Sequence, residues 1–531
     1  MLLHITLKKP PIYQLITVLL FRSALGIISF LKNFMKKNIK KIAIIYPPFK
    51  KDGDYPLLTQ NRQLKFSGSL EVRIFPVLAA TMATSFKNKG YEVLWLDGIN
   101  QRLDMNVFNQ KLISFKPDLI IMETKAPVIK MHWQYADRLK QILPDAVTLL
   151  YGDHVTWKPE ETFSCCSSID YTVQGGYFDF SIPLLAEHLN GRADMPGGIF
   201  RADGSSGPPQ IYDLKDVPLI DYSLCQWHMY HEAYLYSPAA YIMSGRGCGG
   251  PDGRPGFCTF CVWQHTLWDK KPALRPVKNV VDEIEMLVKQ YKVKEIFDDN
   301  DSGFIYNREW TYDFHEEMKK RKLIGQVHLS ANCRSDTLDY DFCRLLKKTG
   351  FRLLKIGIEA GNDATLKKIG KNENMATLYQ GVYAAKKAGL KVLLTNMIGY
   401  PWQTEEEVKE QYRHVKKLML YKTRFGDSMQ ASVVIPYPGT PLYRQAVKKD
   451  WFTIAPDDYK KFDMDIPVLK TDINTTYWCR KMWKIQFHPL FLLKSFLTLK
   501  NLQDIKMAFT GVKSLAGHLK DYTLESKNKD N

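Results

Sequence analysis

The chain has 531 residues, with 74 Lys and Arg against 56 Asp and Glu, and 45% of its residues are apolar. This length exceeds what one hydrophobic core organises, and the composition excludes a largely disordered chain. Nine cysteines are few for this length and odd in number, which excludes a disulfide framework. We therefore expect a cytoplasmic protein of two or three domains in a reducing compartment.

The positive charge is concentrated at the two ends of the chain. Residues 1–40 carry seven Lys or Arg and no acid, and residues 472–531 carry ten bases against five acids. These ends supply +12 of the net +18 and leave +6 for the 431 residues between them (531 − 40 − 60). We expect no nucleic-acid partner, because a nucleic-acid enzyme usually concentrates its charge on a central groove. Basic, apolar ends favour peripheral contact with the inner face of a membrane, and solvated tails are the alternative.

The N-terminal extension, residues 1–40, contains an apolar run at Pro11–Leu31. The run is long enough to cross a bilayer, but Arg22 lies in its middle. The same residues fit an amphipathic helix on a membrane surface. A third interpretation is that translation begins at Met35.

From Lys40 the pattern changes to short apolar strands separated by helical segments, which predicts a doubly wound, Rossmann-like parallel sheet over residues 41–190. Such a sheet binds ligands at the carboxyl ends of its strands. The predicted strands are Ile42–Tyr46, Tyr91–Asp97, Asp118–Thr124, Ala146–Gly152 and Asp170–Gln174.

Residues 191–238 are rich in Gly, Pro and Asp and predict a linker or short hairpin. A second series of βα units over 239–445 then predicts a partial (β/α)6 barrel of the TIM type, with its chemistry at the carboxyl ends of the strands. Residues 446–531 are predicted to be helical, and Leu490–Leu519 is either a cap on the barrel or a membrane-surface segment. The predicted barrel strands are Ala240–Ser244, Glu295–Asp299, Val327–Asn332, Leu353–Glu359, Lys391–Ile398 and Gln430–Pro436.

A glycine-rich loop with three cysteines, Cys248, Cys258 and Cys261, directly follows the first barrel strand. Three thiolates on one loop can hold three irons of a cubane cluster and leave the fourth iron open to a ligand. One alternative is a zinc site that includes His265. The other is that the three cysteines are unrelated to one another. The other six cysteines are interpreted as structural or incidental.

The strand, glycines and cysteines, with Phe260 before the last cysteine, resemble the signature of the radical S-adenosylmethionine (SAM) superfamily. The usual pattern is Cys-x3-Cys-x2-Cys, whereas here the first gap, residues 249–257, is nine residues long and is interpreted as a looped-out excursion. The resemblance implies that Cys248, Cys258 and Cys261 hold a [4Fe-4S] cluster. Further segments that resemble the family, in order, are Ile296–Asn300, Asn332–Asp336, Lys355–Gly361, Met397–Pro401 and Ile435–Leu442.

The resemblance also implies SAM contacts from Phe260, Asn332, Arg334 and Glu359. In such enzymes SAM coordinates the open iron, one electron cleaves its S–C bond, and the resulting 5′-deoxyadenosyl radical abstracts hydrogen from an unactivated carbon. An external electron donor of the flavodoxin or ferredoxin type is expected, and the substrate is expected to be a small molecule or lipid-like. The residues that perform catalysis on the substrate are not identified by sequence.

A domain before the barrel resembles the cobalamin-binding class of this superfamily. Tyr46–Phe49 and Gly152–Thr156 resemble two turns of that class, which implies cobalamin contacts from Tyr46, Pro47, Pro48, Gly152, His154 and Thr156. The chain departs from the class in two ways. It has no Asp-x-His-x-x-Gly motif to supply a lower axial ligand, and Gln174–Tyr177 replaces the usual Gly-Glu-Gly-Glu.

The expected function is a cobalamin-dependent radical SAM enzyme that methylates or rearranges an unactivated carbon. The alternative is a non-catalytic iron–sulfur or cobalamin-binding protein that retains the fold. Modification of tRNA is disfavoured by the nearly even charge of the middle of the chain.

Overall fold

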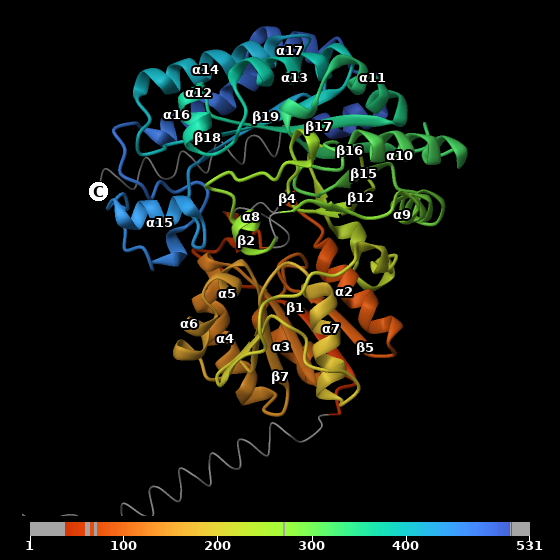
Figure 1. The fold of residues 1–531 in the computed structure, drawn as a ribbon, viewed down its shortest axis with the longest axis vertical. Coiled ribbons are helices and arrows are strands. Elements are labelled where there is room, and N and C mark those ends of the chain that lie inside the picture. The colour runs from red at the N-terminus through yellow and green to blue at the C-terminus, as the bar shows by residue number, and fades with distance from the viewer. Residues whose placement is uncertain (1–37, 59–63, 68–71, 269–270, 510, 512–531) are drawn as a thin grey trace, which may run out of the picture.

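The computed structural model describes residues 38–58, 64–67, 72–268, 271–509 and 511. Within these residues two separate sheets organise the chain, and Figure 1 shows them one below the other. The prediction for Pro11–Leu31 lies outside the described residues. Among the helices that are described, none combines the length and the apolar character that crossing a membrane requires.

The first sheet is built around five parallel strands in the order β5-β1-β6-β7-β8. Every predicted strand of this series is present: the first is one residue longer than predicted, and the other four are one residue shorter at one or both ends. A hairpin from the predicted linker, β9 (Ile199–Arg201) and β10 (Gly204–Ser205), extends the sheet antiparallel to β8. The parallel strands are β1 (Lys41–Tyr46), β5 (Glu92–Asp97), β6 (Leu119–Thr124), β7 (Val147–Gly152) and β8 (Tyr171–Val173).

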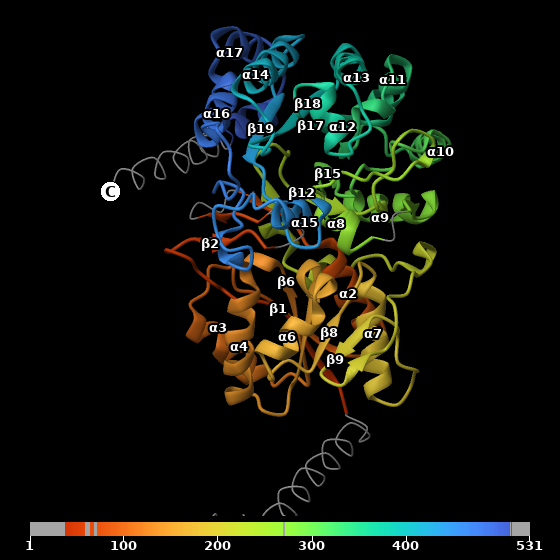
Figure 2. The ribbon, with the colours of Figure 1, turned by 60° about the vertical axis from the view of Figure 1, so that its left-hand side comes forward.

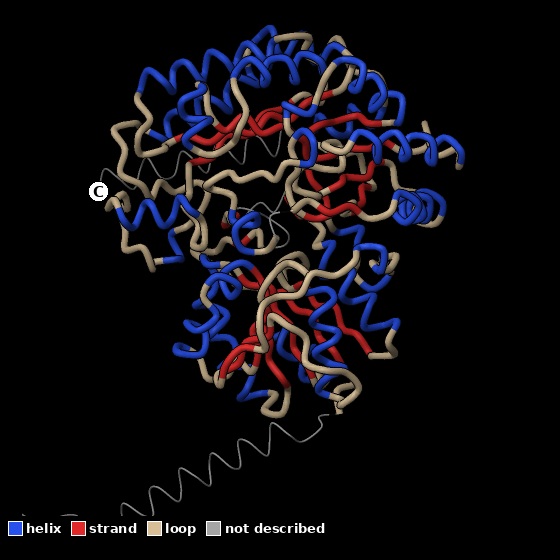
Figure 3. Tube along the Cα trace, viewed as in Figure 1, coloured by secondary structure: helices blue, strands red, loops and turns tan. Residues whose placement is uncertain are grey.

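Helices cover both faces of this sheet (Figure 3), which explains why its strands are largely apolar. β7, for example, is buried at all six positions, so neither face of that strand meets water. The covering helices include α2 (Val77–Asn88), α3 (Met105–Phe115), α4 (Ile129–Ile142) and α7 (Phe178–Leu189).

The second sheet contains six parallel strands that neighbour one another in chain order. The first and last strands do not pair among the described residues, so the barrel is open. The predicted α/β fold, a Rossmann-like sheet followed by a partial barrel, is therefore confirmed. The strands are β12 (Ala239–Ile242), β15 (Glu295–Asp298), β16 (His328–Cys333), β17 (Phe351–Glu359), β18 (Lys391–Ile398) and β19 (Ser428–Val433).

Helices cover the outer face of the barrel, and their ends follow local capping rules. α14 (Glu405–Leu420) begins with a capping box in which Thr404 and Glu407 exchange hydrogen bonds. α11 (Tyr340–Thr349) ends at Gly350, whose φ of 116° favours glycine. The other covering helices are α9 (Val277–Lys289), α10 (Arg308–Lys320) and α13 (Met375–Lys387).

The segment after the barrel folds back onto it. α15 (Pro441–Lys448) follows the last strand, and α16 (Thr475–Trp483) packs against β19, where Trp483 Nε1 donates to the carbonyl of Ala431 at 3.0 Å. α17 (Pro489–Phe496) continues beside α14 (Figure 2). This helical segment therefore caps the edge of the barrel that β19 leaves open.

A buried ion pair joins the two units. Arg246, at the end of β13 (Gly245–Arg246), donates to both carboxylate oxygens of Asp179 in the first turn of α7, at 2.9 and 2.6 Å. The same guanidinium donates to the carbonyl of Gly176 at 2.7 Å. Both charged side chains are buried, so each depends on the other to offset the cost of leaving water.

We predict that Arg246→Met lowers the free energy of unfolding by about 3–5 kcal/mol, because it leaves the Asp179 carboxylate buried without its cation. Equilibrium denaturation, followed by circular dichroism, measures the change. The matched control is Lys278→Met, which removes an exposed pair with Asp282 and should change stability by less than about 1 kcal/mol. Equal losses in the two variants would contradict the prediction.

Candidate active site

The nine residues between the first two cysteines of the loop form a closed excursion. Gly249 pairs with Pro255 in an antiparallel bridge, and Gly250 N donates to the carbonyl of Arg254 at 2.6 Å. Gly256 N then donates to the carbonyl of Cys248 at 2.8 Å. The chain thus leaves after Cys248 and returns beside it, so the extra residues do not separate Cys248 from the Cys258–Cys261 turn in space.

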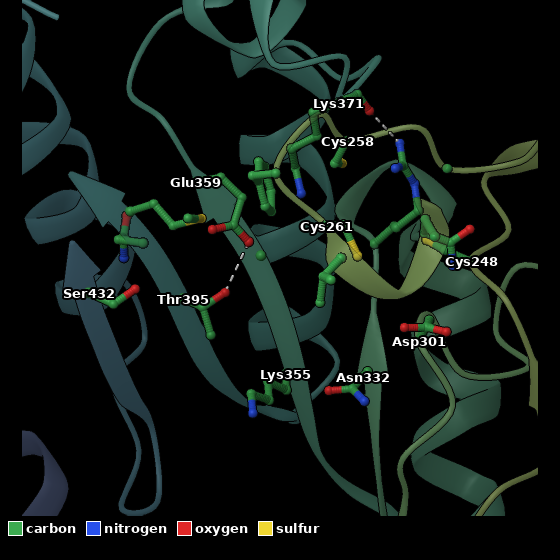
Figure 4. A pocket seen from close by; sticks show the side chains of 18 of the residues that line it. Cys248, Cys258, Cys261, Asp301, Asn332, Lys355, Glu359, Lys371, Thr395 and Ser432 are labelled. Atoms are coloured by element: carbon green, nitrogen blue, oxygen red, sulfur yellow. Dashed lines mark hydrogen bonds between the residues drawn. The ribbon is translucent and has the colours of Figure 1, made fainter. Parts of the chain in front are cut away.

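Cys248, Cys258 and Cys261 line one cavity of about 240 Å³ at the carboxyl ends of the barrel strands. Figure 4 shows their side chains in this cavity, with Glu359 and Lys371 on neighbouring walls. Desolvation by the surrounding protein raises the pKa of the Cys248 thiol to about 12, although the Arg334 guanidinium opposes the shift. None of the three forms a disulfide.

The arrangement of donors around the loop counts against a single zinc ion. Within the described part of the chain, no three His, Cys, Asp or Glu side chains converge closely enough to hold one metal ion. A zinc site needs its thiolates at about 2.3 Å from one point, whereas the thiolates of a cubane cluster bind different irons and lie further apart. His265, the proposed fourth zinc ligand, instead approaches the carbonyl of Cys258 with Nε2 at 3.1 Å.

The predicted SAM-binding residues all line this cavity. Asn332, on β16, donates through Nδ2 to the carboxylate of Asp299 at 3.2 Å and to the carbonyl of Asn300 at 3.0 Å. Arg334 donates to Asp336 and to the carbonyl of Lys371 at 2.9 Å, and its guanidinium lies 3.2 Å from Glu373. Phe260 is half-buried on the cysteine loop. These contacts hold the polar side chains in fixed positions at the rim of the cavity.

Glu359 ends β17 in a strained conformation. The φ angle of Glu359 is 65°, a left-handed backbone conformation that residues other than glycine rarely adopt. The pairing of β17 with β18 shifts register just before Glu359. Its carboxylate accepts from Thr395 Oγ1 at 3.2 Å. Desolvation raises the pKa of Glu359, and the nearby Lys371 ammonium opposes this. Backbone strain of this kind is typical of functional sites.

Sequence reasoning did not identify several residues of the cavity, among them Lys371, Gln264 and Asn396. Gln264 and Asn396 are buried, and within the described part of the chain neither amide atom of either side chain has a hydrogen-bond partner. A polar ligand in the cavity would satisfy these amides. Their sequence contexts carry no distinctive pattern. Lys371 joins the site only because a turn at Gly370 returns the chain to the cysteine loop.

The residues predicted to contact cobalamin lie at or near the carboxyl edge of the first sheet, but their polar groups make internal contacts. The hydroxyl of Tyr46, before Pro47 and Pro48, donates to Glu123 at 2.9 Å. His154 is buried, and its Nε2 lies 3.0 Å from Glu161. Thr156 donates to the carbonyl of Gly152 at 2.7 Å. A Cβ atom at position 152 would lie 2.1 Å from the carbonyl oxygen of Thr124, so this glycine serves close strand packing.

Aromatic side chains from the barrel unit lie against part of this edge. α8 (Val262–Thr266) and the residues after it place Trp263, Leu267 and Trp268 over the ends of β6 and β7. The small cavity that these residues line measures about 20 Å³, which is room for a water molecule.

Comparison with known proteins finds a radical SAM domain in the chain. The model of the radical SAM superfamily matches residues 246–415, which include the three cysteines and Glu359. An uncharacterised methyltransferase of Pyrococcus horikoshii is 25% identical over 424 residues, covering 78% of this chain and 88% of its own. An anaerobic magnesium-protoporphyrin IX monomethyl ester cyclase of Rubrivivax gelatinosus is 25% identical over 437 residues, covering 80% and 74%.

Among solved structures, the radical SAM methyltransferase TsrM of Kitasatospora setae, with cobalamin and a [4Fe-4S] cluster bound, superposes with a TM-score of 0.63. The alignment covers 91% of this chain and 99% of TsrM at 14% identity, so it establishes the shared fold. The cysteine loop, the open barrel and the family match agree. Residues 246–415 of the chain therefore match the radical SAM domain, which implies a [4Fe-4S] cluster and SAM as cofactors.

Proposed function

We propose that this enzyme transfers a methyl group to, or rearranges, an unactivated carbon of its substrate, and that Cys248, Cys258 and Cys261 hold its cluster. The observation that carries the proposal is the shared cavity: three thiols face the same space as two buried amide side chains without hydrogen-bond partners. The similarity to a methyltransferase supports methyl transfer, and the similarity to a cyclase supports rearrangement of the substrate.

The chain's own residues fit these two cofactors. When bound, the reduced cluster supplies the electron that cleaves SAM. Arg334 and Lys371 lie beside Cys248 and Cys258 and offset the negative charge of the thiolates. Glu359 presents a carboxylate that can accept hydrogen bonds from the ribose or amino group of SAM, and Asn332 and Arg334 line the same cavity.

Cobalamin as a second cofactor is supported by TsrM, which holds it in the same overall fold. Tyr46, Pro47, Pro48, Gly152, His154 and Thr156 are the residues we propose to lie near it. Among the described residues His154 Nδ1 is buried without a hydrogen-bond partner, which leaves one polar atom there unsatisfied.

Radical SAM enzymes act on small molecules and need an external electron donor. We propose a donor of the flavodoxin or ferredoxin type and a lipid-like substrate. The support for a lipid-like substrate is a C-terminal apolar surface of large, exposed side chains, more than a monomeric protein usually leaves in water. It consists of Phe487, Leu490, Leu492, Leu493, Phe496, Leu497, Leu502, Ile505 and Phe509.

Lysines interleave with this C-terminal apolar surface at positions 494, 500 and 506. Apolar side chains flanked by lysines suit the headgroup region of an anionic bilayer, where the apolar groups insert and the ammonium groups meet lipid phosphates. Peripheral contact with such a membrane would bring the enzyme to a lipid-like substrate.

We predict that anaerobically reconstituted enzyme with SAM and a chemical reductant releases 5′-deoxyadenosine, measured by mass spectrometry. Cys258→Ala should reduce it to the background of a protein-free reaction, because the cluster loses a ligand. Cys343→Ala, a buried cysteine of α11, is the matched control and should retain activity. S-adenosylhomocysteine that forms only with added hydroxocobalamin would support methyl transfer. Full iron loading without deoxyadenosine would refute SAM cleavage and favour the non-catalytic alternative.

A second prediction tests the position of Cys248. A Cβ atom at Gly256 would lie 2.7 Å from Cys248 Sγ, so we expect Gly256→Ala to displace this thiol and lower the iron and sulfide bound after reconstitution. Gly253→Ala, in the same excursion, meets no atom within 4 Å and serves as the control. Its positive φ of 71° costs about 1 kcal/mol of local stability but leaves the thiols in place. Equal iron contents in both variants would argue against Cys248 as a ligand.

A third prediction tests membrane contact. The full chain should sediment with vesicles of phosphatidylcholine and phosphatidylserine, and less so at high salt. Phe496→Asp combined with Leu497→Asp should weaken membrane binding by about ten-fold or more, because the two exposed apolar side chains can no longer insert into the bilayer. Val107→Asp, on the exposed face of α3, is the control. Unchanged sedimentation of the double variant would exclude this surface from membrane binding.

A further inference from the structure

The cavity contains a cation that the cluster and SAM do not account for. Lys355 lies on β17 four residues before Glu359, so its Cα is about 13 Å further from the carboxyl end of the strand. Both side chains line the same cavity. Figure 4 shows Lys355 and Asn332 at the end of the cavity away from Cys258 and Lys371.

Lys355 differs from the other cations of the cavity in having no hydrogen-bond or ion-pair partner among the described residues, although its charge still acts on the Glu359 carboxylate over a longer distance. Arg334 contacts Asp336 and Glu373, and Lys371 contacts Glu373 at 3.7 Å. The Lys355 ammonium makes no hydrogen bond and no ion pair with any described residue. A half-buried ammonium inside a barrel is normally paired, so an absent anion is the simplest account of this one.

The strands beside Lys355 add hydrogen-bonding groups that also lack protein partners. Gln430 and Ser432 lie on β19 and line the cavity, and neither side chain hydrogen-bonds to a described residue. Thr395 on β18 lies opposite Gln430 in the strand pairing and lines the same cavity. The amide and hydroxyl groups can donate to the same anion as the ammonium.

The wall between Lys355 and Glu359 is kept clear by Gly357. A Cβ atom there would lie 2.3 Å from the Glu359 carboxylate and 3.2 Å from the Lys371 ammonium. The absence of a side chain at this position leaves a continuous space from Lys355 to the cysteines. A bound molecule can therefore extend from Lys355 toward the cluster end of the cavity.

We propose that Lys355, with Gln430 and Ser432, binds a carboxylate group of the substrate. The inference rests on the proposed function, because it assigns this end of the cavity to the substrate and the cysteine end to SAM. One cation with two neutral donors matches the single charge of a carboxylate. A phosphate, with about two charges, usually gathers more than one cation or a helix N-terminus.

The test uses three fluorinated probes of equal chain length: 4-fluorobutanoate, 4-fluorobutanamide and 4-fluorobutyl phosphate. Their binding to reconstituted protein, saturated with SAM, is measured by fluorine NMR line broadening. We expect the carboxylate to bind, and the neutral amide to bind at least about ten-fold more weakly. Lys355→Met should weaken carboxylate binding by at least about ten-fold, and Lys355→Arg should retain most of it. Lys348→Met, on exposed α11, is the matched control.

Three outcomes would overturn the inference. They are unchanged carboxylate binding by Lys355→Met, preferential binding of the phosphate, and carboxylate binding to SAM-free protein that is lost once the protein is saturated with SAM, which would place the SAM carboxylate at Lys355. Circular dichroism and iron content of each variant exclude misfolding as the cause of a loss. The assay needs no turnover. Failure to cleave SAM would therefore count against the proposed function alone, and Lys355-independent binding against this inference alone.

Discussion

The buried ion pair between Arg246 and Asp179 ties the cysteine loop to the first sheet. Arg246 lies two residues before Cys248, and its guanidinium is held by the Asp179 carboxylate and the Gly176 carbonyl. Asp179 lies in the first turn of α7, where the helix dipole favours a negative charge. The start of the cysteine loop is therefore fixed by groups of another unit. Its position does not depend on the loop's own flexible glycines.

The segment Gln174–Tyr177 takes part in the same contact, because Arg246 donates to the carbonyl of Gly176. Its departure from the Gly-Glu-Gly-Glu of the cobalamin class removes acidic residues, and the structure uses the segment as a packing surface. A Cβ atom at Gly176 would lie 2.3 Å from the ring of Trp268, and Gly176 N donates to the carbonyl of Leu267 at 2.7 Å. The first sheet and the end of the cysteine loop thus pack closely here. This close packing also restricts the space at the carboxyl edge of the sheet.

Inside the barrel, the pairing of the cationic side chains differs between the two ends of the cavity. The cations at its cysteine end, Arg334 and Lys371, are paired with carboxylates and remain close enough to influence the thiols. Lys355, further along β17, has no such pair. An open barrel with polar inner positions is costly to leave without ligands, because buried polar groups that lack partners destabilise the fold. On the proposed function, these unpaired groups are where cofactor and substrate bind.

Periodicity and spacing alone were enough to predict the parallel strands of both sheets, the open barrel and the cysteine loop after its first strand. Apolar runs bounded by turn residues report burial directly, and burial on both faces requires covering helices. The family resemblance added Phe260, Asn332, Arg334 and Glu359, and all four line the cavity. The looped-out excursion after Cys248 was interpreted from the sequence, but only the tertiary structure showed how it closes, through the pairing of Gly249 with Pro255. The tertiary structure also decided that Lys371 joins the site and that Lys355 forms no ion pair with a described residue. These facts arise from contacts between strands and loops far apart in the chain, and no local pattern of residues encodes them.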